Sequence, residues 1–190
     1  MELEISLEKW ADENLLDGDW EVHLLDKNIK NSEQMHLAVF YSSGLYSYLI
    51  GARREMAKKA IEKGCFCVID CPDCQNKISK GTGIFVGTGM REESHPDNPV
   101  KLRMTHISKN KFLRRIGENP RNYETINLHI KYQGKPEEDY LDNAATKLSE
   151  RAMGKGCGFI TDIIYLHHHP ELRHVAISAK GLIKKSSLNR

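Results

Sequence analysis

Features that would place a sequence in a class at once are missing from this chain of 190 residues. It has no run of about 18 apolar residues, the length that a membrane-spanning helix needs. Its N-terminus, Met1 to Ile5, is acidic where a secretory signal would be basic and then apolar. We therefore expect a soluble protein in the cytoplasm, with no membrane partner.

A strong net charge is also missing. The formal charge is +2, so the composition gives no overall case for nucleic-acid binding. Residues 1–34 nevertheless carry ten acids against three bases, and residues 100–121 carry seven bases against one acid. We favour a basic segment that solvent or the acidic segment neutralises, and we keep nucleic-acid binding as the alternative. The bases that would contact a phosphate backbone are Lys101, Arg103, Lys109, Lys111, Arg114 and Arg115.

Cysteine is too scarce and too unevenly placed for a disulfide framework. There are five cysteines, an odd number, and four of them lie between Cys65 and Cys74. In a reducing compartment this cluster indicates metal binding, redox chemistry or plain burial.

What is present is an ordinary globular composition, with 39% apolar and 28% charged residues, and a sequence repeat. When the chain is shifted by 92 positions against itself, the run 63–65 (Lys-Gly-Cys) falls on the same run at 155–157 without a gap. We therefore predict a duplicated unit. Other matched pairs are Phe40/Tyr132, Tyr48/Tyr140, Leu49/Leu141, Ala52/Ala144, Ala60/Ala152, Asp70/Asp162 and Gly89/Gly181.

The first copy is predicted to be a strand, a helix and two further strands. The first strand covers 35–41, and apolar residues at helical spacing predict a helix from about Leu45 to Lys63, with Gly64 as a left-handed cap. Residues 65–70 are apolar on both faces, which is typical of a strand that is covered on both sides. We predict a loop over 71–80 and a glycine-rich strand over 81–92.

The second copy is predicted to repeat this order. Its elements are a strand at 125–132, a helix at 137–155, a strand at 157–166, a turn, and a strand at 173–184. The predicted fold class is α+β, a tandem β-α-β-β repeat. It has two mainly antiparallel sheets, each with a helix on one face, related by a pseudo-twofold axis.

This pattern divides the chain into four parts. Residues 1–34 form an N-terminal acidic extension, 35–92 the first repeat, 93–123 a basic linker and 124–190 the second repeat. Within the linker we expect a short strand in 100–107 and a helix near 109–116. Because each sheet has a second face to cover, we expect the other repeat or another copy of the chain to cover it, which favours a homo-oligomer.

The run 52–69, followed by Val86-Gly-Thr-Gly-Met90, resembles the YbjQ-like families, whose domains were once labelled heavy-metal-binding. The resemblance covers about fifty residues of each half and implies the β-α-β-β fold and a ring-like homo-oligomer. It supplies no catalytic residue. This chain departs from the families by its duplication and by cysteine where they usually have alanine.

A metal site is one hypothesis for the cysteines. Cys71 and Cys74 have the spacing of a zinc-binding pair, which provides half of a tetrahedral site. Cys65 and Cys67 would point to the same side of a strand and would complete the site only if that side meets the loop. Structural cysteines, a zinc site and a redox pair stay open for this cluster, and we favour the first. We expect Cys157 in the core, because the matching position of the first copy precedes the same strand.

Histidines offer a second source of metal ligands. The run 167–169 is predicted to lie in the turn between the last two strands, with His174 nearby. Imidazoles can bind transition metals, but three adjacent residues on an extended chain cannot all face one ion. A polar loop is the favoured interpretation. A composite site would combine Cys71 and Cys74 with His167 and His169.

Other patterns fit structural roles better than catalytic ones. The glycines between 81 and 89 lack the spacing of a phosphate-binding loop and suit a curved strand. His106 belongs to a short His-x-Ser pattern that two-histidine phosphoesterases would need twice. Asp70 and Asp162 are either paired carboxylates or caps of the following turns, and we favour caps.

Our first hypothesis is therefore a non-catalytic oligomeric protein that binds a ligand or acts as a scaffold. A metal-binding regulatory protein, using zinc or another thiophilic metal, is the second. A hydrolase or transferase with a site between the two repeats is the third, and the sequence leaves enzymatic activity open.

Overall fold

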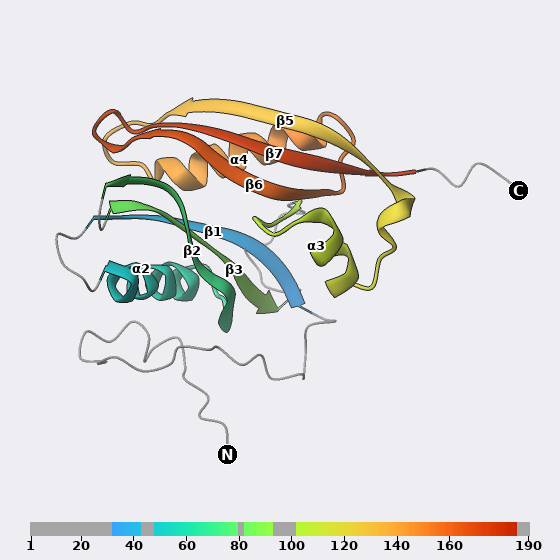
Figure 1. Cartoon of the computed structure of the whole chain (residues 1–190), viewed down its shortest axis with the longest axis horizontal. Helices are drawn as coiled ribbons and strands as arrows, with labels where there is room; N and C mark the ends of the chain where they lie inside the picture. The colour runs from blue at the N-terminus through green and yellow to red at the C-terminus, as the bar shows by residue number, and fades with distance from the viewer. Residues whose placement is uncertain (1–31, 43–47, 80–81, 93–101, 186–190) are drawn as a thin grey trace, which may run out of the picture. The chain divides into compact units, whose positions relative to one another are not determined.

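The structure, a computed structural model, describes four stretches of the chain: residues 32–42, 48–79, 82–92 and 102–185. They belong to two compact units that divide between Pro99 and Val100. Each unit combines a sheet with a helix packed on it, so the predicted α+β class is confirmed (Figure 1). Most of the predicted acidic extension lies outside the described residues. Among the described helices, none has the length and apolar character needed to cross a membrane.

The first unit consists of β1 (Ser32–Ser42), α2 (Tyr48–Glu62), β2 (Cys67–Ser79) and β3 (Thr82–Glu92). Its three strands pair antiparallel in the order β1-β3-β2. Helix α2 packs along this sheet (Figure 1). The order of elements agrees with the predicted first copy, and β1 begins three residues before the predicted boundary at Met35.

The second unit repeats this order with β5 (Tyr123–Gln133), α4 (Tyr140–Met153), β6 (Phe159–His169) and β7 (His174–Lys184). These strands pair antiparallel in the order β6-β7-β5. The strand–helix–strand–strand sequence predicted for this part of the chain is confirmed.

Residues 102–122 add β4 (Arg103–Met104) and α3 (Lys109–Arg115) to the second unit. Strand β4 pairs in parallel with the start of β6, and the buried Phe112 and Leu113 of α3 join the apolar core of this unit. The short strand and the helix expected here are both confirmed. Residues 102–122, which we assigned to a linker, therefore pack as part of the second unit.

Helices α2 and α4 end in the same way. Gly64 has a φ of 72°, and the N–H of Cys65 donates to the carbonyl of Ala60 at 2.9 Å. In the second unit Gly156 has a φ of 75°, and the N–H of Cys157 donates to the carbonyl of Ala152 at 3.0 Å. This is the Schellman arrangement, in which a glycine reverses the chain so that the last carbonyls find donors. The predicted left-handed cap is confirmed.

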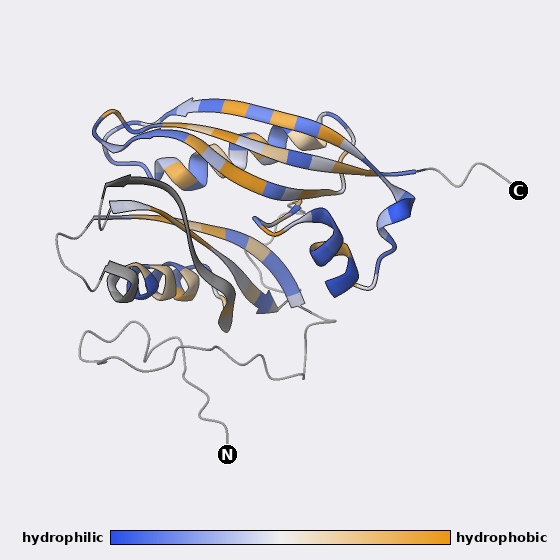
Figure 2. Cartoon of the chain, in the orientation of Figure 1, coloured by the Kyte–Doolittle hydropathy of each residue, from blue (hydrophilic) through white to orange (hydrophobic). Residues whose placement is uncertain are grey.

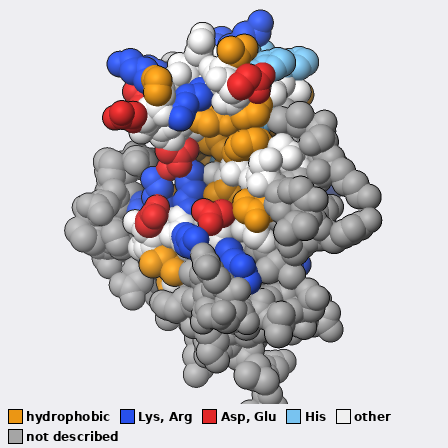
Figure 3. Space-filling view, turned by 90° about the vertical axis from the view of Figure 1, so that its left-hand side faces the viewer, with side chains coloured by type: hydrophobic (Ala, Val, Ile, Leu, Met, Phe, Trp, Pro, Cys, Tyr) orange, Lys and Arg blue, Asp and Glu red, His pale blue; other side chains and the backbone are white. Residues whose placement is uncertain are grey.

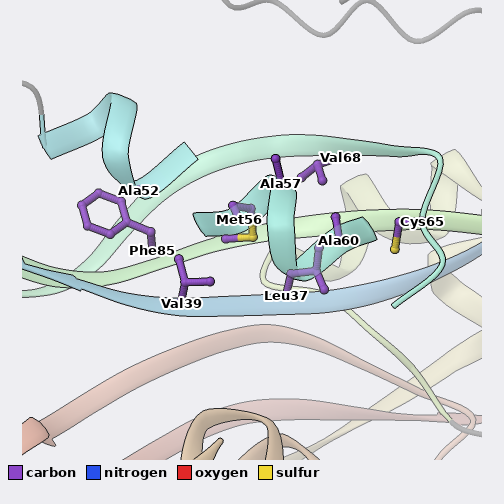
Figure 4. Close-up of a cluster of buried hydrophobic side chains, with 9 residues drawn as sticks. All are labelled: Leu37, Val39, Ala52, Met56, Ala57, Ala60, Cys65, Val68 and Phe85. Atoms are coloured by element: carbon purple, nitrogen blue, oxygen red, sulfur yellow. The ribbon is translucent and has the colours of Figure 1, made fainter. Parts of the chain in front are cut away.

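The residue after each cap enters the core. Cys65 belongs to the buried cluster between α2 and its sheet (Figure 4), and Cys157 is buried as predicted. A Cβ added to Gly89 would lie 2.6 Å from the Sγ of Cys65, and one added to Gly181 would lie 2.5 Å from the Sγ of Cys157. The glycine of the central strand therefore gives the thiol its space. The other members of the first-unit cluster are Leu37, Val39, Ala52, Met56, Ala57, Ala60, Val68 and Phe85.

The loop predicted over residues 71–80 is wrong, because β2 continues to Ser79. Its pairing with β3 breaks between Ile69 and Asp73 and resumes beyond it, so the extra residues around Pro72 form a bulge. A proline without an N–H is tolerated there because β2 is an edge strand. The glycine-rich strand predicted over 81–92 is confirmed as β3.

Candidate anion-binding face

Strand β5 alternates between buried and exposed side chains. Leu128 and Ile130 are buried, whereas Asn127, His129 and Lys131 are exposed. Successive side chains of a strand point to opposite sides of the sheet, so the polar residues share one side. Figure 2 shows this alternation as changing colours along β5.

The neighbouring strand β7 extends this polar side. Antiparallel partners point to the same side, and Asn127 pairs with Lys180 while His129 pairs with Ser178. Lys180 is exposed and Ser178 is partly exposed. We call this surface the β5–β7 face, and its members are Thr125, Asn127, His129, Lys131, Ser178 and Lys180.

All six side chains of the β5–β7 face can donate a hydrogen bond, and two of them are ammonium groups. None of the six carries a carboxylate. A carboxylate does stand beside the face, since the Oδ1 of Asp162 lies 3.7 Å from the Nζ of Lys180. Donors and cations of this kind suit an anionic ligand, since hydrogen bonds to an ionised partner are the stronger ones.

Asp162 has a structural task beside this face. It lies at a break in the β6–β7 pairing and has a φ of 53°. Its Oδ2 accepts hydrogen bonds from the backbone N–H of Lys109 and from the hydroxyl of Thr161, both at 3.0 Å. The carboxylate thus ties the start of α3 to β6, as a cap would. The side chain of Asp70, its predicted counterpart, lies outside the described residues.

Helix α3 brings further cations to one end of the face. Phe112 and Leu113 are fully buried, and the ring centres of Phe112 and Phe159 lie 5.4 Å apart in an edge-to-face arrangement. The opposite side of the helix exposes Lys111 and Arg114. A short amphipathic helix is therefore fixed on the sheet by its apolar side and presents its basic side to solvent.

Lys109 joins α3 to the β5–β7 face. Its Nζ donates to the carbonyl of Tyr123 at 2.8 Å and to the hydroxyl of Thr125 at 3.0 Å. The α3 cations and the face are therefore one continuous surface. Of the six predicted phosphate contacts, Lys111 and Arg114 are exposed, Arg103, Lys109 and Arg115 are partly exposed, and Lys101 lies outside the described residues.

Lys184 adds a cation at the same end. Its Nζ lies 3.3 Å from the Oε1 of Glu118 and 5.8 Å from the ring centre of Tyr123. The hydrogen bond to Glu118 raises the pKa of Lys184, and burial raises the pKa of Tyr123. The lysine therefore keeps its charge throughout the neutral range.

At the other end of the second unit, the predicted histidine turn is wrong. Residues 167–169 form the end of β6, because its pairing with β7 continues to His169 opposite His174. The turn is the short 3-10 helix η3 (Pro170–Leu172). His167 and His169 are exposed while His168 is buried, as the alternation of a strand requires.

His168 packs against α4. Its ring lies parallel to that of Tyr140 at 5.7 Å, and the Tyr140 hydroxyl is hydrogen-bonded to its Nε2. Burial lowers the pKa of His168 to about 4 and raises the pKa of Tyr140 to about 12. Both are neutral at pH 7, so the hydrogen bond joins a neutral hydroxyl to a neutral imidazole. This contact fixes the hairpin on the helix.

The proposed metal ligands do not come together among the described side chains. Cys65 is buried against Gly89, and the side chains of Cys67, Cys71 and Cys74 lie outside the described residues. In the described part of the chain, no group of three or more His, Cys, Asp or Glu side chains is arranged to hold a metal ion. The cysteine zinc site stays a prediction.

Two histidines do meet, His169 exposed and His174 partly exposed. The rings of His169 and His174 are 6.1 Å apart, and the Oε1 of Glu171 lies 3.8 Å from the Nδ1 of His169. Histidine side chains also gather at one margin of the surface drawn in Figure 3, near acidic and basic side chains. His106 lies elsewhere, in the partly buried connection between β4 and α3.

The β5–β7 face was not predicted from the sequence. Its signal was available, because polar and apolar residues alternate from Thr125 to Gln133. The alternation alone does not show which strand lies beside β5, and the contribution of Ser178 and Lys180 depends on that pairing.

None of the protein-family models matches the chain, and the searches of curated proteins and of solved structures also give no match.

Proposed function

We propose that the chain is a non-catalytic binding protein whose β5–β7 face, together with the basic side of α3, binds nucleic acid through its phosphate backbone. The observation that carries this proposal is the link from Lys109 to Thr125, which makes the sheet donors and the helix cations one surface. Backbone contacts by lysine and arginine provide affinity without sequence recognition.

The chemistry of the face supports a backbone ligand rather than stacked bases. Its side chains are hydroxyl, amide, imidazole and ammonium groups, whereas base-stacking surfaces present exposed aromatic rings. The stretch from Thr125 to Lys131 spans roughly 20 Å at about 3.3 Å per residue. That length accommodates several consecutive phosphates.

The test is binding of a fluorescently labelled 20-nucleotide single strand and of the matching duplex, measured by polarisation at 50 and 200 mM salt. We expect the double variant Lys131→Glu, Lys180→Glu to weaken binding at least tenfold. On duplex DNA, the slope of log K against log salt should fall by about 0.9 for each phosphate that the variant no longer neutralises.

Lys147 and Lys155 provide the matched control, because both are exposed lysines of the same unit and lie on α4 and just after it. Lys147→Glu, Lys155→Glu changes the net charge equally but should leave the affinity within about twofold. An equal loss of affinity in the two double variants, or no binding at 50 mM salt, would refute the proposal.

We also infer that the two units are copies of one β-α-β-β ancestor. The register supports this, since Cys67 pairs with Met90 and Phe159 pairs with Leu182, a shift of 92 in both strands. The first strands follow a shift of 91, because Ser32 lies opposite Glu92 and Tyr123 lies opposite Lys184. Tyr132 therefore corresponds to Tyr41, not to Phe40 as the ungapped alignment suggested.

A side-chain contact supports the same inference. Lys59 of α2 donates to the carbonyl of Ala38 at 2.7 Å, and Arg151 of α4 donates to the carbonyl of His129 at 2.8 Å. The two cations are 92 positions apart and the two carbonyls 91 apart, as the register requires. A crystal structure in which 32–92 and 123–184 fail to superimpose with this pairing would contradict duplication.

Self-association is a second candidate property, and exposed apolar side chains on β6 favour it. Ile164 is 48% exposed and Leu166 is 44% exposed. Strand edges are less suitable, because Lys59 and Arg151 occupy edge carbonyls and bulges interrupt β2 and β6. Light scattering should show an oligomer that Ile164→Asp dissociates, whereas a monomer at high concentration would refute this candidate.

A further inference from the structure

The last pair of the β6–β7 ladder consists of two histidines on the same side of the sheet. His169 lies directly opposite His174, and both belong to the hairpin that η3 closes. Directly opposed residues of an antiparallel pair have Cβ atoms about 4.5–5.5 Å apart. Both imidazoles are therefore within reach of a single ion.

The backbone of this hairpin is fixed by contacts with residues 134–139, the connection between β5 and α4. Arg173 adopts a left-handed conformation with a φ of 48°, and its carbonyl accepts the N–H of Gly134 at 3.0 Å. Its Nη1 donates to the carbonyls of Lys135 at 3.2 Å and Glu138 at 3.1 Å. The two histidine Cα atoms are thus held in place before any ligand arrives.

Glu138 strengthens this attachment. Its carboxylate accepts the backbone N–H of Lys135, the Tyr132 hydroxyl at 3.2 Å and the Asn143 amide at 3.1 Å. The backbone hydrogen bond is the main cause of the lowered pKa of Glu138. The loop that holds the hairpin is therefore itself anchored to β5 and α4.

We propose that His169 and His174 together bind one divalent transition-metal ion of the Cu²⁺ or Ni²⁺ type. With metal–nitrogen distances of about 2.0 Å, two imidazoles on one ion have ring centres about 4.5–6.5 Å apart. The observed separation of the rings is 6.1 Å, inside that range.

The ligand set distinguishes between metals. Two imidazoles, with water at the other positions, suit the tetragonal coordination of Cu²⁺ and Ni²⁺. The Oε1 of Glu171 is 3.8 Å from the Nδ1 of His169, so its negative charge lies beside the imidazole pair. The site uses none of the cysteines and does not depend on the anion-binding face.

The probe is Ni²⁺ alone, added to the full chain and followed by calorimetry, because Ni²⁺ does not oxidise the thiols as Cu²⁺ can. We expect His169→Ala and His174→Ala each to weaken Ni²⁺ binding at least tenfold. Glu171→Gln should weaken it by a smaller factor, about threefold. His129→Ala, an exposed histidine on β5, is the matched control and should change affinity less than twofold.

Two outcomes overturn the proposal. Binding that persists in the His169→Ala, His174→Ala double variant and disappears in Cys71→Ser, Cys74→Ser would place the ion on the cysteines. An equal loss of affinity in His129→Ala would show unspecific histidine binding. In both cases circular dichroism of each variant establishes that the fold is intact, so that a lost affinity is not a lost structure.

Discussion

The two units have the same order of strands and helix, but they differ on the side of the sheet that faces away from the helix. In β1 the side chains of Gln34, His36 and Ala38 are buried, although Leu37 and Val39 on the other side already pack in the α2 cluster. The corresponding positions of β5, by the register of the two ladders, are Thr125, Asn127 and His129, and all three are exposed.

This difference shows that the fold needs only one covered face. The α2 and α4 sides share the cap, the buried cysteine and its glycine partner. The opposite side is free to change, and it carries buried side chains in the first unit and exposed donor groups in the second. We therefore expect ligand binding on the second unit, and we expect substitutions on the first unit to have larger effects on the free energy of unfolding.

The largest expected effect concerns an ion pair of the first unit that has no counterpart at the matching positions of the second unit. Arg91 donates to Glu33 at 2.7 Å with both side chains buried, whereas the counterparts Glu124 and Ile183 form no such pair. Glu33→Gln leaves a buried guanidinium without its counter-charge, so the free energy of unfolding should fall by about 3–5 kcal/mol.

Denaturant unfolding and hydrogen exchange over 32–92 measure this decrease. Glu124→Gln is the control and should stay within about 0.5 kcal/mol of the wild type, because Glu124 is exposed. Similar decreases in the two variants would contradict the contrast between the units.

The second effect is a pH dependence of the second unit. The pKa of His168 is lowered to about 4 by burial, below the 6.5 of an unfolded histidine. The folded state therefore resists protonation. The contribution of the neutral His168 to the free energy of unfolding is fully present above pH 6.5. It should fall by roughly 2–3 kcal/mol as the pH drops towards 4.

Unfolding curves between pH 4 and 7, recorded with EDTA, test this expectation. His168→Gln should make the free energy of unfolding depend less on pH than in the wild type. The carboxylates contribute equally to both proteins, so their contribution cancels in this comparison. His129→Gln should leave it unchanged, since His129 is exposed. The same slope with and without His168 would show that this histidine is not the cause.

The third effect should be equal in the two units. Gly89→Ala and Gly181→Ala each place a Cβ against a buried Sγ, at 2.6 and 2.5 Å. Such overpacking costs about 1–3 kcal/mol, and replacing the facing Cys65 or Cys157 by alanine should recover part of it. Unfolding measurements test the two double-mutant cycles, one for Gly89 with Cys65 and one for Gly181 with Cys157. A coupling energy in only one cycle would contradict an equivalent glycine–thiol contact in the two units.

The smallest effect separates two equivalent contacts. Lys59 is buried where it donates to Ala38, whereas Arg151 is exposed where it donates to His129. Lys59→Ala leaves a buried carbonyl without its donor and should cost about 1–3 kcal/mol. Arg151→Ala should cost about 0.5 kcal/mol or less, because water replaces the guanidinium. Chemical denaturation of both variants checks this, and the reverse order would refute the comparison.

Local patterns predicted the elements of both units. Apolar residues at helical spacing, followed by Gly64 or Gly156, marked the helices and their ends, because a left-handed glycine cap is decided within one turn. Cys157 was placed in the core because the matching position of the first copy precedes the same strand, and that placement is confirmed.

Features that depend on distant partners were not predicted. The composition around Pro72 is that of a turn, yet the neighbouring strand extends β2 through it as a bulge. The burial of His168 depends on Tyr140 of another element. The connection between β5 and α4 is one residue longer than that between β1 and α2, so an ungapped comparison misaligned the first strands.

The candidate site shows the same division. The basic residues of α3 were recognised from their density in the sequence, and their continuity with β5 through Lys109 required the folded chain. The histidines of the β6–β7 hairpin were recognised as candidate metal ligands, but His174 and Glu171 became partners of His169 only through the register of the hairpin.

Cys157 is the only cysteine between residues 100 and 190. Its thiol is buried beside Gly181, and burial raises its pKa, so little thiolate is available while the fold is closed. A thiol-reactive dye will therefore label this position at the rate at which the second unit opens. The labelling rate of Cys157, measured by mass spectrometry, therefore reports how often the second unit opens, without any engineered probe.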